Sequence, residues 1–349
     1  AQFVGKSIKF YLVILSFFVN LIFANYQFET IASNLDDAWS FDFLNENQII
    51  FTEQPGKIKI VTISSGEILN VEGAPKVQYA SQGGLSEIVL DPDFKKNNIL
   101  YLTYSALNES GKSTLFLMSA ELSNNSLINK KVIFEANAFR RVPIHLGAKI
   151  DFLPDGTLLL TSGDGFDYKE QAQSLNNHFG KIIRLNKDGS VPSDNPFVDI
   201  PNALPEIFSY GHRNMQGLVV MEDGRIFEHE HGPRGGDEFN LIEPGKNYGW
   251  PAITYGIDYS GAVISPFTKM DGMEQPLKYW VPSIAPSDMI YYDGDLYPEL
   301  KNSFLVTALK SRDVKQIKKI NSLFSEESIF SNLKSRLRSI GISPSGEMY

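Results

Sequence analysis

The stretch from Glu230 to Pro251 carries residue types that bind a hard cation. It reads EHGPRGGDEFNLIEPGKNYGWP, so two adjacent carboxylates, Asp237 and Glu238, follow a corner at Gly232 and Pro233. Such a turn can point backbone carbonyls outward, and carbonyl and carboxylate oxygens are the ligands that Ca²⁺ takes in sets of about six to eight. The stretch therefore predicts a cation site, although the acidic pair could instead cap a turn.

A second glycine-flanked loop, Tyr210 to Leu218, reads YGHRNMQGL and sets a cation beside an amide. An arginine keeps its charge at physiological pH, so Arg213 suits a place where negative charge develops, and Asn214 could hold the same ligand. Upstream, His145 precedes Gly147 in PIHLGAKIDFLPDG, and a loop imidazole is well suited to take a proton near neutral pH. On the residues alone, each of these could equally be a structural loop residue.

Three further cations lie late in the chain. Lys310 falls in FLVTALKSRDV, and Arg336 and Arg338 fall in KSRLRSIG. Two residues apart on a strand, the two arginines would share one face and point at the same anion, although solvated cations at strand ends are the alternative. Gln82, in SQGGLSEIVLDPDF, sits beside two glycines that let the backbone approach a ligand closely.

In order and approximate spacing, these motifs resemble those of the soluble glucose and aldose sugar dehydrogenases that depend on pyrroloquinoline quinone (PQQ), from about Thr30 to the last residue. The resemblance implies that His145 is the general base, which removes the proton of the anomeric hydroxyl as hydride leaves C1 of the sugar for C5 of the quinone. It implies that Arg213 stabilises the charge on the reduced quinone. It also implies a set of cofactor contacts: Gln82, Arg213, Asn214, Tyr259, Lys310, Arg336 and Arg338.

The resemblance divides the metal ligands between two Ca²⁺ sites. The carbonyls of Gly232 and Pro233 would clamp one ion against the quinone, where a cation polarises the reacting carbonyl. Glu238 and the carbonyl of Tyr248 would hold a separate structural ion, with Asp237 close enough in sequence to assist.

The chain also departs from this family at positions near the motifs. Ile144 stands where the glucose enzymes carry an aspartate, and Ala148 replaces a usual glycine. Met215 replaces a proline, while Ser86 and Glu87 replace an apolar pair. We expect the departures beside His145 to alter sugar contacts more than the base itself.

The elements that must bring these scattered residues together are predicted to be short strands. Turn signals flanked by alternating apolar runs dominate the chain, and long helical periodicity is missing outside the first residues. Six hairpin-like segments recur, with turns near Asn45, Asp93, Asp155, Asp223, Asp293 and Ser345, in steps of 48, 62, 68, 70 and 52 residues. A blade of a β-propeller needs about 40–50 residues plus loops.

We therefore predict an all-β fold over residues 30–349, a six-bladed β-propeller with four-stranded antiparallel blades. Two separate sandwiches are the alternative, but no Pro/Ser-rich linker or shift in composition divides the chain. Because the sequence stops at Tyr349, within the first hairpin of the sixth repeat, the last blade is expected to be truncated and to leave an exposed sheet edge. A central channel would gather loops from all blades.

The first residues resemble a secretory signal. Lys6 and Lys9 precede Phe10 to Phe23, a run of fourteen residues that is apolar except at two positions and is too short for a comfortable membrane span. We expect residues 1–24 to be a signal peptide and the mature chain to be periplasmic or secreted, without a membrane span. An uncleaved anchor is the alternative.

The composition of the chain excludes several classes of binding partner. With 32 basic against 41 acidic residues and a net charge of −9, the chain is a poor match for nucleic acid. It has no cysteine, so a disulfide framework and a thiolate site are both excluded. Nucleotide-binding motifs and HExxH are missing in suitable context. The expected partners are an aldose sugar and an external electron acceptor of unknown identity.

Two other functions fit a propeller of this kind. A non-catalytic extracellular propeller would use the scaffold for binding, but would not need His145, Arg213 and Lys310 together. A sugar-lactone hydrolase would centre Ca²⁺ in a channel rich in Asp, Asn and Glu, and the cationic channel expected here argues against it.

Overall fold

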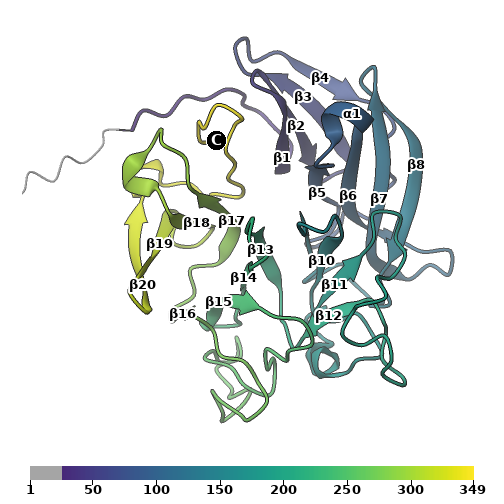
Figure 1. Ribbon diagram of the computed structural model, residues 1–349, viewed down its shortest axis with the longest axis vertical. Coiled ribbons are helices and arrows are strands. Elements are labelled where there is room, and N and C mark those ends of the chain that lie inside the picture. Colours follow the sequence, from purple (N-terminus) through teal and green to yellow (C-terminus); the bar gives the residue numbers. More distant parts are fainter. Residues whose placement is uncertain (1–25) are drawn as a thin grey trace, which may run out of the picture.

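The computed structural model describes residues 26–349, which form five four-stranded antiparallel sheets set as blades around a central axis (Figure 1). In every sheet the strands follow one another in chain order. The first strands of neighbouring blades contact one another, so they line the centre of the ring. The signal peptide expected at residues 1–24 lies outside the described residues.

The strand bounds are as follows. Blade 1 holds β1 (Ala38–Asn45), β2 (Gln48–Glu53), β3 (Lys57–Thr62) and β4 (Ile68–Val71). Blade 2 holds β5 (Leu85–Leu90), β6 (Ile99–Leu107), β7 (Ser113–Ser123) and β8 (Ser126–Glu135). Blade 3 holds β9 (Gly147–Phe152), β10 (Leu158–Ser162), β11 (Lys181–Leu185) and β12 (Ile207–Tyr210). Blade 4 holds β13 (Met215–Val220), β14 (Ile226–Glu230), β15 (Asp237–Ile242) and β16 (Lys278–Trp280). Blade 5 holds β17 (Pro286–Tyr292), β18 (Ser303–Ala308), β19 (Val314–Ile320) and β20 (Leu323–Ile329).

Helices are few and short. They are α1 (Phe94–Asn97) and the 3₁₀ turns η1 (Lys169–Gln173), η2 (Pro298–Leu300) and η3 (Ser331–Leu333). No helix in the part of the chain from residue 26 onward is long and apolar enough to cross a membrane.

The recurring hairpins expected from the sequence are confirmed as the two innermost strands of each blade. In blade 3, for example, β9 and β10 pair through the turn at Asp155 and Gly156, and every residue of β10 is buried. Inner strands are covered on both faces by the adjacent blades. Outer strands such as β20 alternate between exposed and half-buried residues, as expected at the rim.

Five complete blades and a partial sixth agree with the expected propeller whose last blade is truncated. The described residues form five four-stranded sheets, and a short hairpin at 341–349 stands in the gap between blade 5 and blade 1 (Figure 1). Gly341 and Tyr349 exchange two backbone hydrogen bonds of 2.9 Å. Tyr349 packs edge-on against Phe43 of β1, and Ser339 Oγ donates to the carbonyl of Trp39 at 2.6 Å. This segment therefore joins the last blade to the first.

A repeated polar contact also locks neighbouring blades together. Three aspartates on inner strands each accept a hydrogen bond from a backbone N–H on the next element round the ring. The pairs are Asp42 with Leu90, Asp151 with Val220, and Asp288 with Ile340, at 2.9, 2.8 and 3.1 Å. Apolar side chains fill the spaces outside this inner ring, as where Ile50 and Ile58 cluster with Leu85 and Leu100 between blades 1 and 2.

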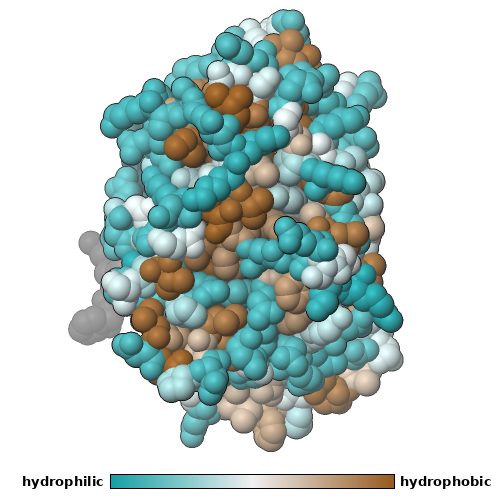
Figure 2. Space-filling model, turned by 90° about the vertical axis from the view of Figure 1, so that its right-hand side faces the viewer, coloured by the Kyte–Doolittle hydropathy of each residue, from teal (hydrophilic) through white to brown (hydrophobic). Residues whose placement is uncertain are grey.

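The outer surface on the side of β8 is mostly hydrophilic, and its apolar residues form small separate patches (Figure 2). Exposed Lys130 and Lys131 lie on β8 itself, the outermost strand of blade 2. Lysines on an outer strand discourage pairing with another sheet.

Candidate active site

The inner strands begin at a cavity of about 380 Å³. Its lining comes from the starts of β1, β5, β9 and β13 and from the segment after η3. It includes four of the residues predicted to contact a cofactor: Gln82, Asn214, Arg336 and Arg338. His231 also lines this cavity, and Leu146 and Gly147 place the loop of His145 at its wall.

His145 is held as one half of a buried pair with Asp164. Its Nδ1 lies 2.8 Å from Asp164 Oδ1, and its backbone N–H donates to the side-chain oxygen of Gln82 at 3.0 Å. The residue has a φ of +46°, in the left-handed region that favours glycine. Backbone strain of this kind persists where the surroundings over-determine it, often at functional sites. An ionised Asp164 favours the tautomer with hydrogen on Nδ1, which leaves Nε2 as the free base.

The electrostatics of the pair suit a proton acceptor. Burial lowers the pKa of His145, and the positive charges of Arg213 and Arg140 add to this effect, while Asp164 opposes it. Burial alone would raise the pKa of Asp164, but the hydrogen bond with His145 and nearby positive charge together hold it below its usual value. The imidazole is therefore neutral, and its partner ionised, near neutral pH.

Asp164 was missed by the sequence reasoning. Besides His145, it accepts hydrogen bonds from the indole of Trp250 at 2.7 Å and from the backbone of Phe166 at 2.9 Å. It lies between two glycines directly after β10, the strand that pairs with β9 just beyond His145. A carboxylate at a glycine turn, one strand after a candidate base, is the signal that could have identified it.

Arg213 lies beside this pair, since its carbonyl accepts a hydrogen bond of 2.7 Å from the backbone N–H of Asp164. Its Nη1 donates to the carbonyls of Gly232 at 2.8 Å and His231 at 3.0 Å, while its buried Nε has no partner in the described part of the chain. The guanidinium also lies over the rings of Trp250 and Tyr259. The exposed Tyr259 therefore lies next to Arg213, and its predicted contact with a cofactor stays a prediction.

The strand expected to carry Arg336 and Arg338 is absent. Both lie in an irregular segment after η3, so the pairing on one strand face was wrong, yet both line the cavity. Arg338 donates to Gln216 at 2.7 Å and stacks over Trp39, with 3.7 Å between its guanidinium carbon and the ring centre. Burial lowers the pKa of Arg338 to about 10, so it stays charged. Its Nε is also buried without a partner among residues 26–349.

Lys310 lies at the edge of this cavity. Its neighbour Leu309 lines the wall, and the backbone N–H of Lys310 donates to the carbonyl of Ile284 at 3.0 Å. Its side chain is exposed, so it is free to turn toward a bound anion.

The predicted metal ligands separate into two places. Asp237 accepts hydrogen bonds from the backbone of Gly232, Ile284 and Ala285 and from the hydroxyl of Ser283, at 2.7–3.1 Å. It therefore fixes the Gly-Pro corner to the start of β17. Adjacent strand residues point to opposite faces, so Glu238 lies on the other face of β15, opposite Glu230 of β14. The structure thus separates Asp237 from Glu238.

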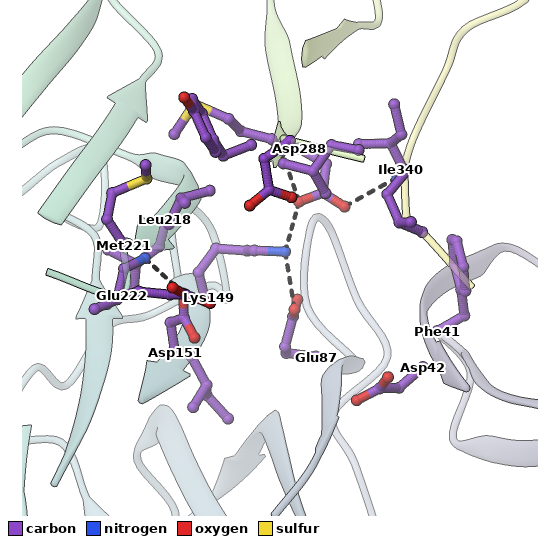
Figure 3. Close-up of a pocket in the computed structure, with 18 of the residues that line it drawn as sticks. Phe41, Asp42, Glu87, Lys149, Asp151, Leu218, Met221, Glu222, Asp288 and Ile340 are labelled. Atoms are coloured by element: carbon purple, nitrogen blue, oxygen red, sulfur yellow. Dashed lines mark hydrogen bonds and ion pairs between the residues drawn. The ribbon is translucent and has the colours of Figure 1, made fainter. Parts of the chain in front are cut away.

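The far half of the channel holds a second, acidic cavity of about 620 Å³ (Figure 3). Between the two cavities, Lys149 Nζ lies 2.9 Å from both Glu87 and Asp288. Burial raises the pKa of Glu87 to about 7, although the positive charge of Lys149 lowers it. Glu87, which departs from the family pattern, is thus one arm of a buried ion triad that joins blades 2, 3 and 5. The carboxylate-rich cavity contains none of the predicted cofactor contacts.

Known proteins match this chain over most of its length. The sequence model of the glucose/sorbosone dehydrogenase family matches residues 35–349. The aldose sugar dehydrogenase YliI of Escherichia coli (strain K12) is 34% identical over 337 residues, which cover 93% of this chain and 90% of that protein. Quinoprotein glucose dehydrogenase B of Acinetobacter calcoaceticus is 31% identical over 68% of this chain and 55% of its own length. The crystal structure of the soluble aldose sugar dehydrogenase from Escherichia coli, in its apo-form, is similar with a TM-score of 0.88 at 31% identity, covering 92% of this chain and 94% of that one.

Proposed function

Because this chain belongs to the glucose/sorbosone dehydrogenase family, we propose that it oxidises aldose sugars at C1 to the lactone, with PQQ and Ca²⁺. The observation that carries the proposal is the buried pair of His145 and Asp164, together with the guanidinium groups of Arg213 and Arg338, which each keep a buried N–H without a partner among residues 26–349. A base beside unsatisfied cationic donors suits an oxidation that removes a proton and places negative charge on an anionic acceptor.

The residues of the cavity fit PQQ, a cofactor with three carboxylates. A buried N–H without an acceptor is costly, and the Nε atoms of Arg213 and Arg338 both lack one. Carboxylate or quinone oxygens would satisfy them. The residues that would hold the cofactor are Gln82, Arg213, Asn214, Tyr259, Lys310, Arg336 and Arg338. The chemistry that PQQ supplies when bound is a two-electron oxidation.

The Gly-Pro corner fits Ca²⁺ at the same site. The Gly232 carbonyl accepts one hydrogen bond, from Arg213, and a carbonyl oxygen has a second lone pair available to a cation. Asp237 holds the corner in place from behind through the backbone of Gly232. The carbonyls of Gly232 and Pro233 would be the protein ligands of this ion, and Glu238 with the Tyr248 carbonyl would hold a structural one.

In this mechanism, Nε2 of His145 takes the proton of the C1 hydroxyl. Asp164 stabilises the imidazolium that forms and keeps the ring oriented. The lowered pKa of His145 favours the unprotonated base at neutral pH, so its protonation limits turnover only under acidic conditions. Arg213 supplies fixed positive charge where the electrons arrive.

The signal-like residues at 1–24 support a periplasmic or secreted location for this reaction. The electron acceptor that reoxidises the enzyme is external and of unknown identity. A non-catalytic binding propeller and a lactone hydrolase are disfavoured because neither needs a buried histidine base together with two arginines with unsatisfied donors.

The direct test is reconstitution. Purified apo-protein is titrated with PQQ and Ca²⁺, and sugar-dependent bleaching of a redox dye is followed. We expect activity to rise with PQQ to a plateau at one equivalent. A protein that binds PQQ and Ca²⁺ yet bleaches no dye with any aldose would overturn the proposal.

Chelation should reduce both activity and thermal stability. Ions that bind only the folded state stabilise it, by about 2.7 kcal/mol at a free concentration of a hundredfold Kd. We expect Glu238→Gln to affect mainly stability, because Glu238 lies on the face of β15 away from the Gly-Pro corner. Equal melting temperatures of the wild type with and without chelator, measured by calorimetry, would argue against a tight structural site.

Selectivity among sugars should be broad and weak. Ile144, next to the base, offers no polar partner and cannot penalise a sugar that lacks a matching hydroxyl. We expect glucose, galactose and xylose to show comparable kcat/KM, with KM values of about 1 mM or above. Ile144→Asp is the matched variant and should sharpen selectivity. A wild-type preference for glucose of more than about 10²-fold, the size expected from dedicated hydrogen bonds, would contradict this inference.

A further inference from the structure

A group of buried oxygen ligands lies on one face of blade 4, away from the Gly-Pro corner. In the ladder of β14 and β15, Glu228 pairs with Asn240 and Glu230 pairs with Glu238. Residues two apart on a strand share a face, and so do direct cross-strand partners, so all four side chains project together. Glu228, Glu230 and Asn240 are at most 4% exposed, whereas Glu238 is half-buried and opens the group toward solvent.

The connection from blade 3 adds a histidine to this group. Nδ1 of His212 lies 3.1 Å from Glu230 Oε2, and its ring is stacked on Tyr248. One ligand atom each from His212, Glu228 and Glu230 lie within 4.8 Å of one another. Burial lowers the pKa of His212 to about 3, so the ring is neutral and can offer a lone pair.

Two buried oxygens in the group have no hydrogen-bond partner within residues 26–349. They are Oε1 of Glu228 and Oδ1 of Asn240, whose amide nitrogen donates to Glu228 at 3.1 Å and to Glu238 at 3.4 Å. The amide end of Asn240 therefore lies between these two carboxylates. Buried oxygens without donors are expensive unless a proton, a water or a cation satisfies them.

Arg213 lies close to the group and donates its backbone N–H to both carboxylate oxygens of Glu230 at 3.3 Å. No lysine or arginine side chain in residues 26–349 forms an ion pair with Glu228, Glu230 or Glu238. Three carboxyl groups therefore lie together on one face of blade 4, with no basic side chain of residues 26–349 paired to any of them.

We propose that His212, Glu228 and Glu230 bind a divalent transition-metal ion of the Mn²⁺ or Zn²⁺ class where blade 3 meets blade 4, with Asn240 completing the site and Glu238 left to the structural Ca²⁺ of the proposed function. An imidazole nitrogen among carboxylates suits these ions, whereas Ca²⁺ takes oxygen ligands. The site uses neither the Gly-Pro carbonyls nor the Tyr248 carbonyl. It does not depend on sugar oxidation.

The test counts metal on the full-length chain without PQQ. Chelated protein is dialysed against an excess of Ca²⁺, which fills calcium sites, and is then titrated calorimetrically with MnCl2 or ZnCl2. We expect one equivalent to bind to the wild type. We expect Glu228→Gln to weaken that binding by at least about 10-fold, a loss seen even for outer-shell partners of metals. Glu222→Gln, at an exposed glutamate near the start of β14, should bind as the wild type does.

A second readout separates loss of the site from loss of the fold. Without metal, Glu228→Gln should melt no lower than the wild type, because a neutral isostere removes repulsion. With Mn²⁺ or Zn²⁺, only the wild type and Glu222→Gln should gain melting temperature. Glu230→Gln provides a second weakened variant if Glu228→Gln does not fold. The proposal is overturned if the calcium-saturated wild type binds neither ion stoichiometrically, or if folded Glu228→Gln binds it unchanged.

Discussion

Replacing His145 by alanine should lower turnover by about 10²–10⁴-fold while PQQ still binds. No other imidazole in the described chain combines a carboxylate partner at 2.8 Å with a place at the wall of the cofactor cavity. Stopped-flow reduction of the PQQ-loaded enzyme by sugar measures the affected step directly. Cofactor titration of the same variant shows whether binding is kept.

His178→Ala is the matched control for this variant. His178 is also buried, and its ring lies 2.9 Å from Glu206, but it packs in blade 3 away from the cavity. Its loss should lower stability without changing turnover per folded molecule. Turnover of His145→Ala within a few-fold of the wild type would remove His145 from the role of base.

Replacing Lys149 by methionine should lower the free energy of unfolding by about 3–5 kcal/mol, the usual result of removing one partner from a buried ion pair. The change leaves Glu87 and Asp288 facing each other with no cation between them (Figure 3). Urea denaturation at neutral pH measures the loss. Lys95→Met, at an exposed lysine of α1, should shift the unfolding free energy by far less.

The sign of the pH dependence provides a second check on this triad. Burial raises the pKa of Glu87 to about 7 even with Lys149 present, and removing the lysine would raise it further. A raised carboxyl pKa means that the protonated form is favoured in the fold, so the penalty of Lys149→Met should shrink as pH falls from 8 to 5. A penalty that grows toward acid would mean that the triad is not the cause.

Much of the fold was predictable from local patterns. Aspartate- and glycine-rich turns between short apolar runs identified the inner hairpins. This was possible because hairpin turns and strand periodicity depend on residues that are close together in the sequence. The six recurring turns also predicted five complete blades and a truncated sixth, in agreement with the five sheets and the hairpin at 341–349. The contacts that attach this hairpin to β1 were not predictable in this way, because they join residues from opposite ends of the chain.

Only part of the candidate site was predicted, because contacts between residues distant in the sequence are not visible in local patterns. The resemblance identified Gln82, Asn214 and Arg338, which do line one cavity. Asp164 was missed because its role comes from a contact with His145 across a strand pair. The ion triad was missed because Glu87 and Asp288 lie 62 and 139 positions from Lys149 in the sequence. Ion pairs between residues that are far apart in the sequence have no local sequence pattern by which they could be recognised.

The position of that triad also separates the two cavities. Lys149 and its two carboxylates lie between the cofactor cavity and the acidic cavity beyond. The partition between the cavities therefore depends on ion pairs rather than on apolar packing, and a change that weakens the triad should weaken this partition together with the fold.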